Sequence, residues 1–149
     1  MDNAKAISTL NSLIETLKDG EEGFRTAAEG LTDPQTKAVF QQYSRERAQM
    51  AQELQAEVRA LGGDPEKAGS MSGSVHRGWI NIKSVVTGKN DASIIAEAER
   101  GEDVAKNAYA DAIKASLPSI VGAVVSRQAI KVREAHDRVR SMERAVTAH

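Results

Sequence analysis

Polar side chains interrupt four apolar stripes whose residues recur at steps of three and four along the chain. Glu21 interrupts the first stripe between Leu17 and Phe24, Glu46 or its neighbour Arg47 interrupts the second, and Glu102 interrupts the third. This recurrence is typical of amphipathic helices that each bury one face. Because every interruption lies near the middle of its stripe, antiparallel helices would bring these polar groups to one depth in the protein.

The fourth stripe adds an amide and an imidazole to this layer, Gln128 near its middle and His136 two turns later. Buried carboxylates repel one another and lose solvation, so such a layer needs a cation, protons or arginines as counter-charge. Carboxylates and imidazoles that project inward from four helices hold paired iron or manganese in bundle proteins. The candidate metal ligands are Glu21, Glu22, Glu46, Glu99, Glu102 and His136.

An alternative without metal follows from the arginines that lie beside these carboxylates in the sequence. They are Arg45, Arg47, Arg100, Arg133 and Arg138. A network of glutamate, arginine and histidine in the middle of the bundle would fix the helix register by itself. We favour this network over a bound metal and keep the metal site as the alternative.

The elements that position these residues are four long helices in a single domain over residues 1–149. The stripes predict helices over residues 7–31, 34–61, 91–112 and 118–146, and Asp33-Pro34 and Gly62-Gly63-Asp64-Pro65 are a start and a stop signal. The connection over about 62–90 is too long for a turn, and residues 75–86 in it predict a short amphipathic helix. The sequence therefore predicts an all-α protein, a ferritin-like four-helix bundle of two antiparallel hairpins joined by a long crossover.

The same residues carry a resemblance to known families. The polar layer resembles that of the ferritin-like, rubrerythrin-related superfamily. Nearly the whole chain is similar to an uncharacterised bacterial family of small four-helix-bundle proteins known as domain of unknown function 2383. The stretches that carry this similarity are LIETLKDGEEGFRTAAEG, FQQYSRERAQMAQELQAEVRALGGDP, SVHRGWINIK, ERGED and AHDRVR. The resemblance implies a fold and little about chemistry.

The di-iron pattern of the superfamily is only partly present. It implies Glu on helices one and three and Glu-x-x-His on helices two and four. Glu46 is followed three residues later by Gln49 instead of histidine, and Arg133 precedes His136 where glutamate belongs. Two of the six positions therefore depart from the pattern, which indicates an altered or repurposed centre.

Composition narrows the remaining classes of function. The chain of 149 residues has no cysteine, which excludes thiolate metal sites and disulfides. Its net charge of −1 and 3 % aromatic content argue against a nucleic-acid partner. The polar first residues lack the layout of a secretory signal, and no apolar run is long enough for a membrane span. We expect a cytoplasmic protein with no membrane partner and, without a glycine-rich phosphate loop, no nucleotide cofactor.

Three smaller expectations concern single residues. Trp79 is expected to anchor the crossover against the bundle. Gly101, in the middle of the third helix, is expected to admit the close approach of a neighbouring helix or side chain. Asp137 directly follows His136, but adjacent residues on a helix point apart, so no pair is expected between them.

Two functions remain in competition. The first is a non-enzymatic bundle that acts through assembly or partner binding, in a stress-related role. The second is a di-iron or di-manganese oxidoreductase or iron-handling protein that uses the candidate ligands. A homo-oligomer is expected in either case.

Overall fold

Helices make up nearly all of the structure. The computed structural model describes residues 3–65 and 78–147. Its elements are α1 (Asn3–Gly30), α2 (Pro34–Ala60), α3 (Ile82–Thr87), α4 (Asp91–Lys114) and α5 (Ser119–Thr147). No strand occurs in these two ranges. The prediction of an all-α protein is confirmed, and the four long helices coincide with the four apolar stripes.

Side-chain caps explain where two of the long helices begin. The Asp33 carboxylate accepts a hydrogen bond from the Thr36 backbone N–H at 2.9 Å, and Pro34 occupies the first turn of α2. Asn90 caps α4 in the same way, accepting from the Ser93 N–H at 3.0 Å. Each cap satisfies one of the backbone donors that a helix start leaves unpaired.

The first residue of α4 also holds the turn between α1 and α2. The Asp91 carboxylate accepts hydrogen bonds from the backbone N–H groups of Thr32 and Asp33 at 2.9 and 3.0 Å. It also accepts one from the Thr32 hydroxyl at 3.1 Å. These contacts hold the turn of the α1–α2 hairpin against the first residue of α4, where the second hairpin begins.

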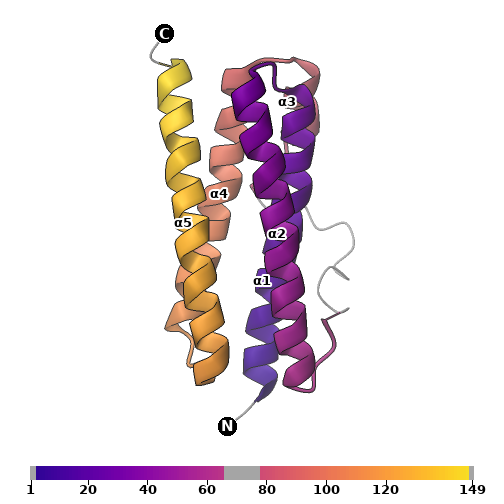
Figure 1. Cartoon of the computed structure of the whole chain (residues 1–149), viewed down its shortest axis with the longest axis vertical. Coiled ribbons are helices and arrows are strands. Elements are labelled where there is room, and N and C mark those ends of the chain that lie inside the picture. The colour runs from indigo at the N-terminus through magenta and orange to yellow at the C-terminus, as the bar shows by residue number, and fades with distance from the viewer. Residues whose placement is uncertain (1–2, 66–77, 148–149) are drawn as a thin grey trace.

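The four long helices pack lengthwise as a helical bundle of two antiparallel hairpins (Figure 1). α1 packs against α2 and α4, α4 packs against α5, and the short α3 contacts both α1 and α4. α2 and α5 contact each other far less than the other neighbouring pairs do. The bundle is therefore closed along the α1–α4 seam and more open between α2 and α5.

Two apolar clusters fill the bundle, with a polar level between them. One cluster contains Leu17 and Leu54, and the other contains Phe24 and Phe40. On α2, Arg47 lies between Tyr43 of one cluster and Met50 of the other. On α4, Glu102 lies between Ala98 and Ala105 in the same manner.

The crossover departs from its predicted form. Gly78–Asn81 form turns, and the helix begins only at Ile82; residues 75–77 of the predicted helix lie outside the described residues. The backbone of Gly78 is left-handed, with φ of 76°, which a helix cannot accommodate. Within the described ranges, every helix is too short or too polar to cross a membrane.

Candidate functional site

The centre of the bundle is occupied by an ion pair between α2 and α4. Arg47 Nη1 donates to Glu102 Oε1 at 2.7 Å, and Nη2 donates to Oε2 at 2.6 Å. The two side chains are 3 % and 0 % exposed. The pair is therefore bidentate and fully removed from water, the geometry in which arginine binds a carboxylate most strongly.

The surroundings of Arg47 are fitted to a guanidinium. A Cβ atom on Gly20 of α1 would lie 3.1 Å from Arg47 Nη1, so the glycine leaves room for the charged group. The guanidinium carbon lies 5.3 Å from the centroid of the Phe24 ring. Burial by itself would lower the pKa of Arg47, but the charge and hydrogen bonds of Glu102 outweigh it and raise that pKa. Arg47 thus stays charged.

A second polar group joins α4 to α5 around His136. Its Nε2 atom lies 2.6 Å from Oδ1 of Asp103, and its Nδ1 atom lies 3.0 Å from Oδ1 of Asp137. The imidazole is 2 % exposed, while the two carboxylates are 52 % and 66 % exposed. Both ring nitrogens can donate to these carboxylates together only when the ring carries a proton on each.

The expectation that Asp137 would not pair with His136 was wrong. Nδ1 is the ring nitrogen nearest the main chain, so a short side chain at the next position reaches it along the helix surface. The hydrogen bond with His136 lowers the pKa of Asp137.

On α4 the buried carboxylates are Glu97 and Glu102, whereas Glu99 is only partly buried. The Glu97 carboxylate accepts from the Asn81 backbone N–H at 2.7 Å and pairs with Arg100. Of the two candidate ligands on α4, Glu102 alone is therefore buried in the core. The second buried carboxylate on this helix is Glu97 and not Glu99. A difference of two positions along a helix rotates the side chain by about 200°. Sequence analysis missed Glu97 because the backbone donor it satisfies lies in the crossover.

The remaining candidate ligands lie at partly exposed positions, and two of them have other partners. Glu22 pairs with Arg25 at 2.9 Å, and Glu46 accepts from Gln42 at 3.0 Å. Glu21 is partly exposed. These three carboxylates do not join the central ion pair.

The structure does not gather the candidate ligands at one point. In residues 3–65 and 78–147, no group of three or more Asp, Glu and His side chains is arranged to hold a metal ion. Gln49 and Arg133, the two departures from the di-iron pattern, are both exposed. Glu102 and His136 are buried, but each is bonded to its own partner.

A third polar connection runs from the core to the surface between α4, α5 and α2. The Tyr109 hydroxyl donates to Gln128 Oε1 at 2.7 Å, and Gln128 Nε2 donates to Glu53 Oε1 at 2.7 Å and to the Met50 carbonyl at 3.2 Å. Glu53 also pairs with Arg127. Burial raises the pKa of Tyr109, so the hydroxyl keeps its proton. Gln128 is fully buried, as its place on the fourth stripe predicted.

Trp79 is wedged between two helices. Its side chain is 1 % exposed, and a Cβ atom added to Gly23 of α1 or to Gly101 of α4 would lie 2.2 Å from the indole ring. The ring packs against Phe24 with centroids 4.9 Å apart. The expectations for Trp79 and Gly101 are both confirmed, since the glycine admits the side chain that anchors the crossover.

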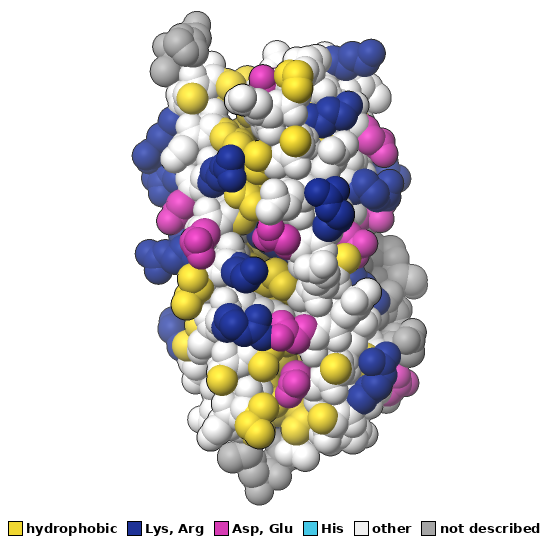
Figure 2. Space-filling view, in the orientation of Figure 1, with side chains coloured by type: hydrophobic (Ala, Val, Ile, Leu, Met, Phe, Trp, Pro, Cys, Tyr) yellow, Lys and Arg dark blue, Asp and Glu magenta, His cyan; other side chains and the backbone are white. Residues whose placement is uncertain are grey.

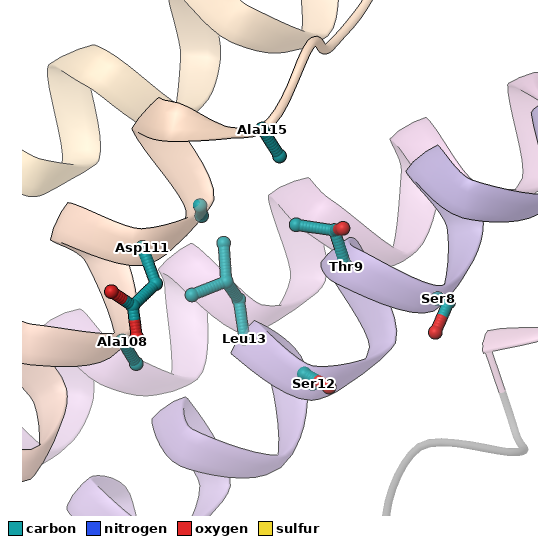
Figure 3. Close-up of a pocket in the computed structure, with 8 residues that line it drawn as sticks. Ser8, Thr9, Ser12, Leu13, Ala108, Asp111 and Ala115 are labelled. Carbon is teal, nitrogen blue, oxygen red and sulfur yellow. The ribbon is translucent and has the colours of Figure 1, made fainter.

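A shallow pocket of about 300 Å³ lies between α1 and α4. Ser8, Thr9 and Ser12 of α1 line it opposite Asp111 of α4 (Figure 3). Asp111 is the one ionisable group among its lining residues, so the hydroxyls have no histidine or lysine beside them to act as a base. This pocket does not present a nucleophile with its activating group.

Comparison with known families gives a match over most of the chain. Residues 5–115 match the family described as Domain of unknown function (DUF2383). The chain belongs to this family. No curated protein matches it. The matched residues include all of α1 except its first two residues and the whole of α2, α3 and α4, and with them both halves of the Arg47–Glu102 pair.

Proposed function

We propose that this chain is a non-catalytic, ferritin-like four-helix bundle that acts through assembly or partner binding. Its two antiparallel hairpins and long crossover support the ferritin-like arrangement. The observation that carries the proposal is the Arg47–Glu102 pair at the level where bundle proteins of this type hold metal.

The geometry of this pair supports a centre that is neutralised without a metal. The guanidinium engages both oxygens of Glu102, so the counter-charge that a buried carboxylate requires comes from within the chain. A cation bound at Glu102 would have to displace Arg47 or lie beside its positive charge. Either outcome costs electrostatic free energy.

Elemental analysis tests this proposal directly. The protein is purified without chelator from cells supplied with iron and manganese, and it is also titrated with Fe(II) under anaerobic conditions. We expect far less than one metal ion per chain in both measurements. About one or two metal ions per chain, lost in Glu102→Gln, would overturn the proposal in favour of the di-iron or di-manganese alternative.

A matched control separates the central pair from ordinary surface carboxylates. Glu22→Gln removes the charge of a carboxylate that is paired with Arg25 and whose side chain is 45 % exposed. If metal content falls equally in Glu22→Gln and Glu102→Gln, the metal is bound loosely at the surface and the proposal stands. The cytoplasmic location and stress-related role remain predictions, to be tested by fractionation and by the survival of a deletion strain.

A further inference from the structure

Neighbouring helices of the bundle pack closely along every line but the one between α2 and α5. The backbones approach closely between α1 and α2, between α1 and α4 and between α4 and α5. Two adjoining hollows of about 290 and 300 Å³ lie along the remaining line, and both are lined by Glu46 of α2 and Lys131 of α5. Figure 2 shows hydrophobic side chains along this line, with charged side chains on both sides. Packing is therefore least complete where α2 faces α5.

The opposite line, the α1–α4 seam, is held by additional contacts from the crossover and the first turn of α4. Trp79 fills the space left by Gly23 of α1 and Gly101 of α4. Near the end of the same seam, Asp91 accepts hydrogen bonds from the turn that follows α1, at the backbone of Thr32 among others. The two hairpins are therefore joined most firmly along α1 and α4.

Polar groups bridge α2 and α5 at two levels. Glu53 of α2 accepts a hydrogen bond from Gln128 of α5 at 2.7 Å and pairs with Arg127. The side chains of Glu53 and Arg127 are 36 % and 53 % exposed, so water competes for this ion pair. At the other level, burial raises the pKa of Tyr43, and Arg138 of α5 opposes that shift, so these two groups also interact. Partly exposed polar links of this kind break at low cost in free energy.

The apolar side of α5 is built from small side chains. In the part of this helix whose side chains the structure describes, the buried apolar residues are Val121, Val125, Val132, Ala135 and Val139. By contrast, α1 buries leucines, an isoleucine and a phenylalanine. Because hydrophobic free energy grows with the apolar area removed from water, α5 contributes less of it than α1 does. Parts of a protein with little buried apolar area are the ones that open locally.

We propose that the bundle opens by a hinge motion in which the α1–α2 and α4–α5 hairpins turn as rigid units about the α1–α4 seam, so that α2 separates from α5. The central pair of Arg47 and Glu102 lies against Gly20 and Phe24 of α1, close to the seam, where such a rotation displaces atoms least. The links between α2 and α5 lie farther from the seam and break instead. This inference goes beyond the proposed function, since the motion occurs with or without a partner.

The motion uncovers a defined apolar surface. Tyr43, Met50 and Ala135 line the two hollows and are largely buried in the closed bundle. Ala112 of α4 is the matching residue on the other side, because it is also buried and borders the pocket of about 300 Å³ between α1 and α4. In the open state the first three residues meet water, whereas Ala112 stays covered.

Thiol labelling tests the motion, because the chain has no cysteine and an engineered one is the single thiol of each variant. Ala135→Cys and Ala112→Cys place it at alanines that are 3 % and 4 % exposed, each beside a hollow of about 300 Å³ that accommodates the sulfur atom. Each is labelled with dithionitrobenzoate on the full chain, dilute enough that closing outpaces labelling, and the rate is divided by that of the unfolded chain. We expect Ala135→Cys to react about 10-fold faster or more, since global unfolding exposes both thiols equally.

Two further substitutions separate opening from unfolding. Glu53→Gln removes the charge of a link that opening breaks, so Ala135→Cys should react about 2- to 5-fold faster in this background. Asp33→Ala removes the cap of α2, an interaction inside the first hairpin that opening leaves intact. It should accelerate Ala112→Cys by about 2- to 10-fold through global unfolding and leave Ala135→Cys unchanged. Glu29→Gln, on α1 and 67 % exposed, is the control that should change neither rate.

Equal corrected rates for the two thiols would overturn the inference. So would an Ala135→Cys rate that responds to Asp33→Ala as strongly as the Ala112→Cys rate does. Circular dichroism checks the fold of each variant, and Met50→Cys, at the neighbouring hollow, replaces Ala135→Cys if that variant does not fold.

Amide hydrogen exchange of the wild type, followed by mass spectrometry, supplies a measurement without substitutions. The helices stay formed in the open state, so their internal hydrogen bonds persist and α5 should exchange about as slowly as α4. Fast exchange along the whole of α5 alone would mean that this helix unfolds by itself, and it would refute the rigid hinge.

Discussion

Breaking the Arg47–Glu102 pair from one side should destabilise the protein strongly. In Glu102→Leu the guanidinium of Arg47 stays buried without its carboxylate, and arginine cannot lose its proton in a protein. Both side chains are at most 3 % exposed, so solvent does not screen the remaining charge. Removing one partner of such a pair typically costs about 3–5 kcal/mol in the free energy of unfolding.

That loss is a large part of the stability of an ordinary domain, which is about 5–15 kcal/mol. For a chain of this size each kcal/mol lowers the melting temperature by about 2–4 °C, so the expected decrease is about 6–20 °C. The measurement is urea unfolding followed by far-ultraviolet circular dichroism, with a thermal melt as a second readout.

A double-mutant cycle separates the pair from the packing of its atoms. Arg47→Met leaves the Glu102 carboxylate buried, but that group can become neutral by taking up a proton, so Arg47→Met should cost less than Glu102→Leu. The double variant should be more stable than the sum of the two losses implies, because neither charge remains.

The exposed pair of Glu22 and Arg25 supplies the control. Its side chains are 45 % and 56 % exposed, and Glu22→Gln should change stability by less than about 1 kcal/mol. A Glu102→Leu loss as small as that of the control, or strictly additive losses in the cycle, would refute the reasoning that the central charges depend on each other.

Three further predictions concern other parts of the bundle. Gly101→Ala should destabilise the protein and shift the fluorescence of Trp79 to longer wavelength, since the added methyl group would lie 2.2 Å from the indole ring; unchanged emission and stability would contradict this packing. Tyr109→Phe should cost about 1–3 kcal/mol by leaving a buried amide oxygen unpaired, and it should reduce the loss of stability above pH 10. The sign follows because burial raises the pKa of Tyr109 above its ordinary value of 10.0. The stabilisation that protonated Tyr109 contributes is therefore complete below pH 10.0 and is lost as the pH rises toward the pKa of the folded state. The pKa of Asp137 is lowered in the folded protein, so its hydrogen bond with His136 stabilises the protein above pH 3.8 and this stabilisation is lost as the pH falls through the folded pKa. In Asp137→Asn the free energy of unfolding should therefore depend less steeply on pH below pH 3.8.

The positions of the helices could be predicted from the sequence because they depend on local signals. Asp33-Pro34 and Asn90 are start signals whose effect does not require knowledge of the neighbouring helices. The apolar stripes likewise identify the buried face of each helix to within about one position. That accuracy is enough to predict an all-α fold and to place Gln128 in the core.

The site was harder to predict, because one position on a helix is a rotation of about 100°. At residues 46 and 47 the stripe allowed either side chain to point inward, and only packing against Gly20 and Phe24 selects Arg47. Glu97 could not be found from its own helix, since its partner is a backbone N–H in the crossover. Contacts between distant segments decide such choices.

The wedge formed by Trp79 has a consequence for folding kinetics. Each hairpin is built from contacts between consecutive helices and can form early, whereas the α1–α4 seam joins residues far apart in the chain and must close a long loop first. Trp79 lies in that seam and is the single tryptophan of the chain, so its fluorescence reports the joining of the hairpins while circular dichroism reports helix formation. A refolding experiment that follows both signals should show the two hairpins joining in a separate step that comes after helix formation.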